Sequence, residues 1–98
     1  LLVPVNDIEW IEASGNYVHL HHRRGMHLVR DTLTRVEQTL DPHDFVRIHR
    51  SAIVRISSVT ELERQSSGDF VVRLSSGREL TLSRNFRRAF EDRIGRQL

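Results

Sequence analysis

Most of the chain alternates hydrophobic and polar residues with a period of two, the pattern of β-strands that bury one face. In the N-terminal part this alternation predicts strands over residues 8–13, 17–21 and 26–30. The first two are joined by Ser14-Gly15-Asn16 and the next two by Arg23-Arg24-Gly25. Because Gly and Asn tolerate the positive φ of tight turns, the pattern predicts a β-hairpin followed by a third strand.

The hydrophobic period then changes from that of a strand to that of a helix. Leu33, Val36 and Leu40 fall on one helical face. Asp31 or Thr32 is suited to cap the helix at its start, and the following Asp-Pro pair stops it. This segment is therefore predicted to form one short helix.

The C-terminal part returns to strand periodicity. Strands are predicted over residues 59–64, 70–74 and 79–82, and the Ser- and Gly-rich segments between them predict turns, so these strands form a meander. Ser83 is predicted to cap a final helix. The apolar stripe of that helix consists of Phe86, Ala89, Phe90 and Ile94.

Length and composition favour one small domain. Ninety-eight residues, 38% of them hydrophobic, build a single modest core. The chain has no cysteine, which fits a reducing cytoplasm, and it has neither an 18-residue apolar run nor a signal-peptide pattern. It begins with Leu1-Leu2-Val3 rather than methionine, so we expect a piece of a longer cytoplasmic protein.

The basic residues are fifteen arginines without a lysine, at a net charge of only +2. Each guanidinium can grip a phosphate or a guanine edge through two hydrogen bonds, although genomic base composition explains the arginine preference equally well. Residues 1–15 hold acids without arginine, residues 16–30 hold arginines without acids, and five arginines follow position 83. This segregation predicts that the fold gathers arginines on one side.

Three short stretches combine polar and aromatic residues where an apolar run meets a turn or a helix start. They read Glu-Ala-Ser-Gly-Asn-Tyr at 12–17, Phe-Val-Arg-Ile-His-Arg-Ser at 45–51 and Ser-Arg-Asn-Phe at 83–86. Each can present an amide, guanidinium or imidazole from a loop on a rigid scaffold. Arg50 and Arg84 are the candidates for bidentate pairing with guanine, at about 1–3 kcal/mol of discrimination for each pair.

Together with a Thr32-Leu33 helix start between the first two stretches and Gly77 before the last, this order resembles the LytTR DNA-binding domain over nearly the whole chain. That family is the output module of many bacterial response regulators. The resemblance implies a mainly β fold with short helices, an elongated antiparallel β-sheet sandwich with a C-terminal helix. It also implies that loops, rather than a recognition helix, enter successive major grooves of double-stranded DNA.

The resemblance further implies transcription regulation in the cytoplasm by pairs of domains on direct repeats about one helical turn apart. A receiver or sensory domain would lie upstream in the full-length chain, and this domain would not contact a membrane. The residues expected to face DNA are Asn16 or Tyr17 in the first loop, His49 and Arg50 in the second, and Arg84, Asn85 and Arg87 in the third.

Simpler roles remain open for several of these residues. Asn16 is suited to be a turn residue only, His49 to be a satisfied half-buried side chain, and Arg87 to lie on a solvated helix face. The chain also departs from the family pattern. Ala52 replaces a bulky aromatic residue, Arg55 stands where asparagine is common, and the first strand, before Asp7, is shortened.

Two other classes of function are weighed against DNA binding. His19 and His21 point to one face of a strand, and with His22 or His27 across the next turn they offer a zinc or nickel site, though without the fixed spacing of known metal sites. An exposed sheet edge would suit a protein-interaction module. His49 and Ser51 have no oriented base and no phosphate-binding loop is present, so we expect neither an enzyme nor a cofactor.

Overall fold

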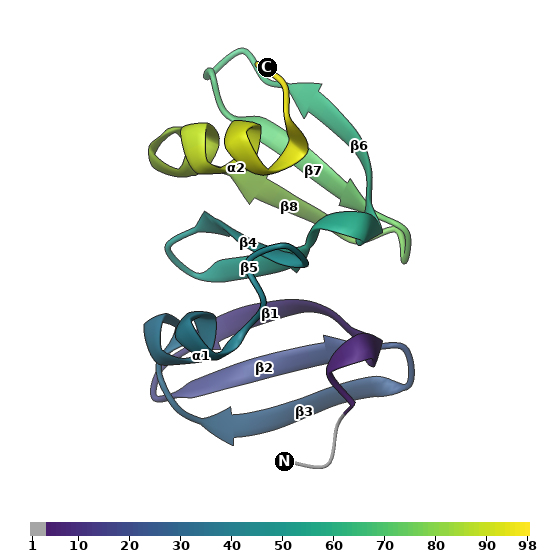
Figure 1. Cartoon of the computed structure of the whole chain (residues 1–98), viewed down its shortest axis with the longest axis vertical. Helices are drawn as coiled ribbons and strands as arrows, with labels where there is room; N and C mark the ends of the chain where they lie inside the picture. Colours follow the sequence, from purple (N-terminus) through teal and green to yellow (C-terminus); the bar gives the residue numbers. More distant parts are fainter. Residues whose placement is uncertain (1–3) are drawn as a thin grey trace.

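The computed structural model describes residues 4–98, which form two antiparallel sheets arranged along the long axis of the molecule (Figure 1). The larger sheet has the strand order β3-β2-β1-β5-β4, and the smaller has the order β6-β7-β8. The strands are β1 (Ile8–Ser14), β2 (Tyr17–His22), β3 (Gly25–Arg30), β4 (Phe45–His49), β5 (Ala52–Arg55), β6 (Val59–Arg64), β7 (Phe70–Leu74) and β8 (Glu79–Leu82). The mainly β antiparallel fold expected from the sequence is confirmed.

Two short α-helices complete the fold. Helix α1 (Leu33–Thr39) packs against β1 of the larger sheet, and helix α2 (Arg87–Ile94) packs against β4. Short 3-10 turns cover Val5–Asp7 (η1), Ile56–Ser58 (η2) and Arg84–Phe86 (η3). The molecule measures 38 × 23 × 22 Å, which agrees with the expected elongated shape.

The first hairpin and the first helix form as the sequence predicts. In the β1–β2 turn Ser14 pairs with Tyr17, and Gly15 takes a φ of +59° while Asn16 keeps a negative φ. Glycine at the first central position with positive φ is the arrangement of a type II′ hairpin turn. At the start of α1, Thr32 Oγ1 accepts a hydrogen bond from the backbone N–H of Arg35 at 3.1 Å, as an N-cap should.

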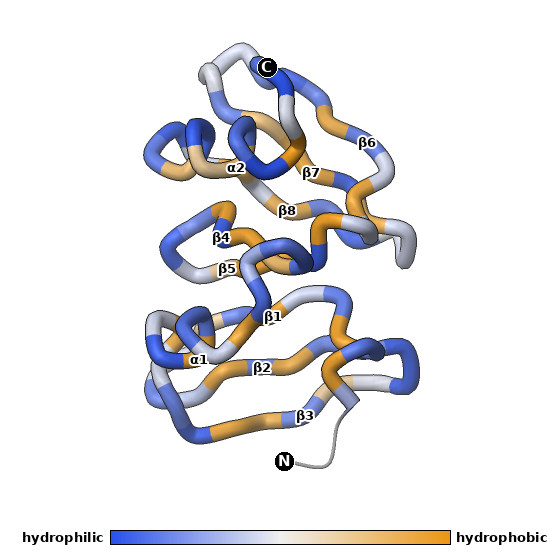
Figure 2. The backbone as a smooth tube through the Cα atoms, in the orientation of Figure 1, coloured by the Kyte–Doolittle hydropathy of each residue, from blue (hydrophilic) through white to orange (hydrophobic). Residues whose placement is uncertain are grey.

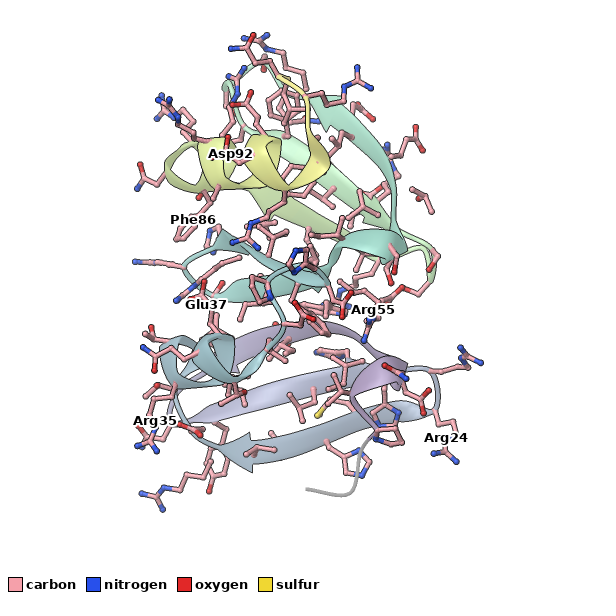
Figure 3. All side chains as sticks on the ribbon, in the orientation of Figure 1. Arg24, Arg35, Glu37, Arg55, Phe86 and Asp92 are labelled. Carbon is pink, nitrogen blue, oxygen red and sulfur yellow. The ribbon has the colours of Figure 1, made fainter. Side chains whose placement is uncertain are left out.

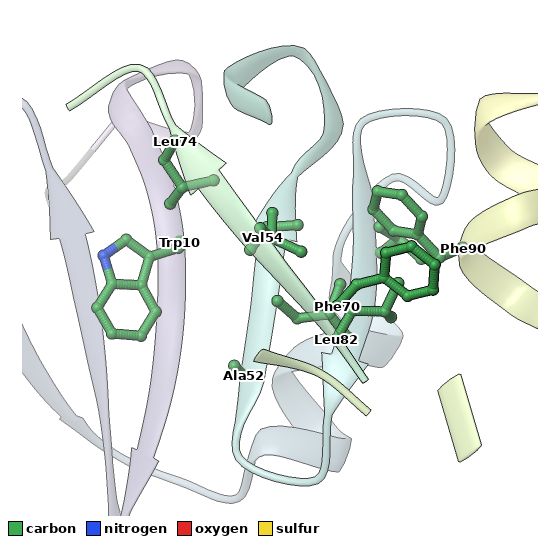
Figure 4. Packing of buried hydrophobic residues seen from close by; sticks show 10 residues of the cluster. Trp10, Ala52, Val54, Phe70, Leu74, Leu82 and Phe90 are labelled. Atoms are coloured by element: carbon green, nitrogen blue, oxygen red, sulfur yellow. The ribbon is translucent and has the colours of Figure 1, made fainter. Parts of the chain in front are cut away.

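The larger sheet is covered on both faces, so the hydrophobic core has two parts. One part lies between the sheets and under α2, where Trp10, Val54, Phe70, Leu82 and Phe90 meet (Figure 4). The other lies between the larger sheet and α1 and contains Ile8, Ile11, Val18, Leu20, Leu33, Phe45 and Ile53. The hydrophobic positions are concentrated in strands and helix faces, while the turn joining β2 and β3 is hydrophilic (Figure 2).

Strands β4 and β5 were not predicted from the hydrophobic period, and the two-part core explains why. Ala52 and Val54 enter the core between the sheets, while Ile53 enters the core under α1. A strand that is buried on both faces shows a continuous apolar run in place of alternation. In addition, the register of β4 shifts between Arg47 and His49, which interrupts the regular pairing of that strand.

The start of the last helix differs from the prediction. The Ser83 side chain makes no capping hydrogen bond; its backbone carbonyl accepts from Phe86 N at 3.0 Å and begins the 3-10 turn η3. The regular helix starts only at Arg87. A capping hydroxyl would accept a hydrogen bond from a backbone N–H of the following turn, and the Ser83 hydroxyl accepts none, so Ser83 does not cap the helix through its side chain.

The departures from the family pattern have local explanations. Ala52 is 6% exposed between the sheets. The Arg55 guanidinium donates to the carbonyl oxygens of Ile8 and Val5 and lies 4.5 Å from the Phe45 ring, so it holds the incoming chain against the larger sheet. The expected shortened first strand lies partly outside the described residues, since these begin at residue 4. From residue 4 onward, no helix has the length and hydropathy to cross a membrane.

Candidate nucleic-acid interface

Three connections that carry predicted DNA-facing residues lie along one side of the molecule (Figure 1). They are the β1–β2 turn, the β4–β5 turn and the connection from β8 through η3, which together we call the loop edge. Strands β1 and β4 run in the same direction because each pairs antiparallel with β5. Both strands therefore end at the same side of the larger sheet.

Backbone hydrogen bonds hold these connections next to one another. The N–H of Ala13 donates to the carbonyl of Ser51 at 2.9 Å, which ties the end of β1 to the β4–β5 turn. The N–H of Ser83 donates to the carbonyl of Ile48 at 2.9 Å, which ties the β8–η3 junction to the end of β4. The β4–β5 turn is thus the middle member of the loop edge.

Arg47, which the sequence analysis did not single out as a functional residue, fixes the shape of the β4–β5 turn. Its guanidinium donates to the carbonyl oxygens of His49 and Arg50 and also to Thr34 Oγ1 and Glu37 Oε1 of α1. The Arg47 side chain is only 17% exposed. It therefore links the turn to the helix and is not available as a free surface cation.

Four of the predicted residues project from the loop edge with free polar groups. Asn16, Arg50, Arg84 and Asn85 are exposed. Within residues 4–98 their side chains form no hydrogen bond or ion pair with the rest of the domain. Their amide and guanidinium groups are therefore available to a partner without breaking contacts inside the domain.

His49 is half-buried, whereas Tyr17 is exposed. The Nδ1 atom of His49 lies 2.9 Å from Ser51 Oγ and accepts the Ser51 backbone N–H at 3.2 Å. A neutral ring that accepts at Nδ1 carries its proton on Nε2, so Nε2 of His49 can act as a hydrogen-bond donor. Tyr17 begins β2 opposite Arg30 and keeps 43% of its surface exposed.

Arg87 is held inside the domain. Its guanidinium donates to Glu91 Oε2 at 3.3 Å and to the carbonyl of Leu98, and it lies 5.4 Å from the centre of the Phe70 ring. The neighbouring Arg88 is exposed. Of these two helix arginines, only Arg88 thus has an exposed side chain that can contact a phosphate in solvent.

The arginines do not gather on one side, contrary to the prediction from their order in the chain. Arg35 lies on the side of the loop edge, whereas Arg24 and Arg55 lie at the opposite ends of the strands (Figure 3). The separation of arginines from acids along the sequence does not become a separation in space, because antiparallel strands carry successive turns to alternate ends of a sheet.

The smaller sheet carries a cluster of acidic residues. Arg73 on β7 lies within 3.5 Å of Glu61 and 2.8 Å of Glu63 on β6, and within 2.7 Å of Glu79 on β8. Hydrogen bonds to Glu63 and Glu79 raise the pKa of Arg73 above its ordinary value. Three carboxylates around one guanidinium leave this patch negative, which disfavours a phosphate backbone there.

The four histidines of strands β2 and β3 fall into two separate groups. His19 and His21 of β2 share a face of the larger sheet with Glu12 of β1, a residue not associated with them from the sequence. His22 and His27 contact each other through Nε2 and Nδ1 at 2.7 Å near the β2–β3 turn. The strand register reveals that Glu12 belongs with these histidines, because Glu12 lies directly opposite His19 in the sheet.

Comparisons with known proteins agree on one family. The profile of the LytTr DNA-binding domain matches residues 1–95. The CO-responsive transcriptional regulator RcoM of Rhodospirillum rubrum is 35% identical over 70 residues, which cover 71% of this chain and 30% of that protein. The positive alginate biosynthesis regulatory protein of Pseudomonas aeruginosa is 34% identical over 85 residues, which cover 85% of this chain and 34% of that protein.

The fold is also similar to a solved structure. A LytTr DNA-binding domain from Bacillus cereus superposes with a TM-score of 0.87 over 95% of this chain and 85% of that one, at 20% sequence identity. The chain spans about a third of the length of the two relatives named above.

Proposed function

This chain belongs to the LytTR DNA-binding domain family, and from that premise we propose that it binds a specific double-stranded DNA sequence as the output domain of a bacterial transcription regulator. The observation that supports this most is the loop edge, where exposed polar side chains project from three connections held side by side. Because such a row of loops is held by a rigid sheet, it can present hydrogen-bond donors to a partner with little loss of conformational entropy on binding.

The length of the molecule is close to the spacing of successive major grooves, so two copies of the domain on adjacent repeats can each place their loops in one groove. The longest dimension of the molecule is 38 Å, and successive major grooves on one face of B-DNA recur about every 34 Å. In this proposal the three connections, which are held side by side, face one stretch of the duplex together, with the β4–β5 turn between the other two. The acidic patch around Arg73 faces away from the duplex.

Sequence would be read by side chains with two-point hydrogen bonding. Arg50 and Arg84 can each donate two hydrogen bonds to the O6 and N7 atoms of guanine, and Asn16 can pair with adenine. Each such pair discriminates against a wrong base by about 1–3 kcal/mol.

Other groups would hold the phosphate backbone. His49 Nε2, the Asn85 amide and Arg88 can each approach a phosphate, and Tyr17 can add a hydroxyl contact. Each phosphate neutralised by a cation steepens the salt dependence of binding by about 0.9 log units in affinity per log unit of salt. Arg87 contributes by keeping α2 in place, since its guanidinium is engaged with Glu91 and Leu98.

The same proposal covers the wider context. We expect two copies of the domain to bind direct repeats about one helical turn apart, in the cytoplasm and without catalytic turnover. We also expect an upstream receiver or sensory domain to control pairing. The length of the relatives supports a further domain, and one relative from Vibrio cholerae is named as a response regulatory protein.

The test compares two arginine variants on specific and scrambled duplexes. The specific duplex is first obtained by selecting bound sequences from a random pool, where we expect an enriched pair of repeats. In gel-shift titrations, Arg50→Ala should bring specific and scrambled affinities together. Arg88→Ala should weaken both equally, because a phosphate contact carries no base information.

Both variants are matched for folding, since each replaces an exposed arginine. Thermal unfolding should be the same for wild type and both variants. If Arg50→Ala keeps the wild-type ratio of specific to scrambled affinity, the proposal that Arg50 reads a base is refuted. If the pool yields no enriched sequence, specific DNA recognition itself is wrong.

A further inference from the structure

Three metal-ligating side chains meet on the face of the larger sheet that looks toward the smaller sheet. Glu12 of β1 pairs directly with His19 of β2, and His21 follows two positions along on the same face. Glu12 Oε1 lies 3.4 Å from His19 Nδ1 and 3.1 Å from His21 Nε2. One ligand atom from each of the three residues lies within 4.8 Å of the others.

These separations are close to those around a tetrahedral ion. Zinc bonds of 2.0–2.1 Å to nitrogen and oxygen place neighbouring ligand atoms about 3.3 Å apart. The two distances from Glu12 Oε1 match that spacing within a few tenths of an ångström. The ligand atoms of the two imidazoles also lie within 4.8 Å of each other.

The site is partly ordered before any ion arrives. The ring of His21 stacks on Trp10 with a centroid distance of 4.1 Å and an interplanar angle of 3°, which restricts its orientation. Trp10 itself is 3% exposed in the core between the sheets. The side chains of His19, His21 and Glu12 keep 23%, 25% and 35% of their surface exposed, so an ion can enter from solvent.

We propose that Glu12, His19 and His21 bind a divalent transition-metal ion of the Zn²⁺ or Ni²⁺ type, with further coordination positions open to water. Two imidazoles and one carboxylate are a donor set that these ions favour, whereas Mg²⁺ and Ca²⁺ require mostly oxygen ligands. The ion would join β1 to β2 and replace the direct contacts between Glu12 and the two histidines.

The site lies close to the loop edge without being part of it. A groove bordered by Trp10, Glu12, His49 and Ser51 connects the two regions. Metal binding is nevertheless a property of the domain alone. The experiment is therefore done without DNA, so that its outcome is independent of the proposed function.

The only tryptophan of the chain reports on the site directly, because Trp10 stacks on His21. Titration of the purified domain with NiCl₂ should quench tryptophan fluorescence saturably at one equivalent, and ZnCl₂ should displace the Ni²⁺ and restore the emission. Isothermal titration with ZnCl₂ provides an independent stoichiometry of one ion for each chain.

Two ligand variants and one matched control locate the ion. Glu12→Gln keeps the shape of the side chain but removes its charge, and His19→Ala removes one imidazole; each should weaken Ni²⁺ and Zn²⁺ binding at least about tenfold. The double variant His22→Gln/His27→Gln removes the other histidine pair and should bind like wild type. Circular dichroism checks that each variant is folded.

Two results would overturn the proposal. The first is the absence of saturable binding to the folded wild-type domain, which would leave Glu12 and the histidines as a hydrogen-bonded cluster only. The second is binding that survives both Glu12→Gln and His19→Ala but disappears in the His22/His27 double variant, which would place the ion near the β2–β3 turn instead.

Discussion

Substitution of Arg47 tests whether the loop edge depends on one organising side chain. Arg47 joins the carbonyl oxygens of His49 and Arg50 to Thr34 and Glu37 on α1. Arg47→Ala removes all of these hydrogen bonds at once. Arg47→Lys keeps a positive charge near Glu37, but a single ammonium cannot replace the planar fork of donors that reaches both carbonyls.

The expected magnitude follows from the individual contacts. A hydrogen bond contributes about 1 kcal/mol net, so the two carbonyl contacts account for about 2 kcal/mol. The partly exposed pair with Glu37 adds less than about 1 kcal/mol. We therefore expect Arg47→Ala to lower the free energy of unfolding by about 2–3 kcal/mol and the Tm by roughly 10–20 °C.

The same change should weaken specific DNA binding beyond its effect on stability. A β4–β5 turn released from Arg47 has to be ordered when it binds, at a cost of about 1–2 kcal/mol for each residue fixed. We expect specific affinity to fall by about tenfold or more at temperatures where the variant is fully folded, an effect that corresponds to about 1.4 kcal/mol. Thermal denaturation and gel-shift titration measure the two effects separately.

Matched variants separate the turn contacts from the helix contacts. Glu37→Gln removes only the ion pair with α1 and should cost less than about 1 kcal/mol. Arg50→Ala removes an exposed side chain while keeping the carbonyl that Arg47 contacts, and should change stability by no more than about 0.5 kcal/mol. If Arg47→Ala and Arg47→Lys melt like wild type and bind the specific duplex equally well, the organising role of Arg47 is refuted.

Three further predictions concern the scaffold. Phe90→Ala removes a fully buried ring from the core under α2 and should lower the free energy of unfolding by about 3–5 kcal/mol, measured by urea denaturation. Gly15→Ala should destabilise the β1–β2 turn, because an L-residue rarely adopts its φ of +59°, and should lower Tm while Ser14→Ala does not. The Leu98 N–H, then Arg87, hold the pKa of Glu91 below the ordinary 4.5. A carboxylate whose pKa is lower in the folded state stabilises the fold at pH values above its unfolded pKa, and this contribution is lost as the pH falls through the folded pKa. The difference in unfolding free energy between wild type and Glu91→Gln should therefore shrink below about pH 4.5. A difference that does not change with pH would contradict this prediction.

Local patterns predicted the elements whose two faces differ. Strand β2 alternates because Val18 and Leu20 are buried on one face while the histidines between and after them are only half-buried on the other, and α1 carries both an apolar face and a Thr32 cap. Strand β5 escaped prediction because Ile53 and Val54 are buried on opposite sides of the sheet. Periodicity detects a difference between faces, so an element without such a difference leaves no periodic signal.

Candidate site residues divide in a similar way. The exposed ones, such as Asn16 and Arg50, belong to turns and could be selected from turn chemistry and from the family resemblance. Arg47 could not, because its role depends on α1 lying beside the β4–β5 turn. The grouping of Glu12 with His19 likewise depends on the register between β1 and β2, which cannot be predicted from the local sequence of either strand.

The division of labour between exposed and held arginines follows from the energetics of loop recognition. A bidentate contact to a base yields about 1–3 kcal/mol of discrimination, whereas ordering even a two-residue turn costs about 2–4 kcal/mol if the turn is mobile. A mobile loop would therefore lose most of the selectivity that Arg50 can provide. In this domain the backbone of the turn is already fixed by Arg47 and by the bond from Ala13 to Ser51, so that only the Arg50 side chain remains to be ordered. If Arg50 reads a base as proposed, Arg47 should therefore be as necessary for selectivity as Arg50 itself.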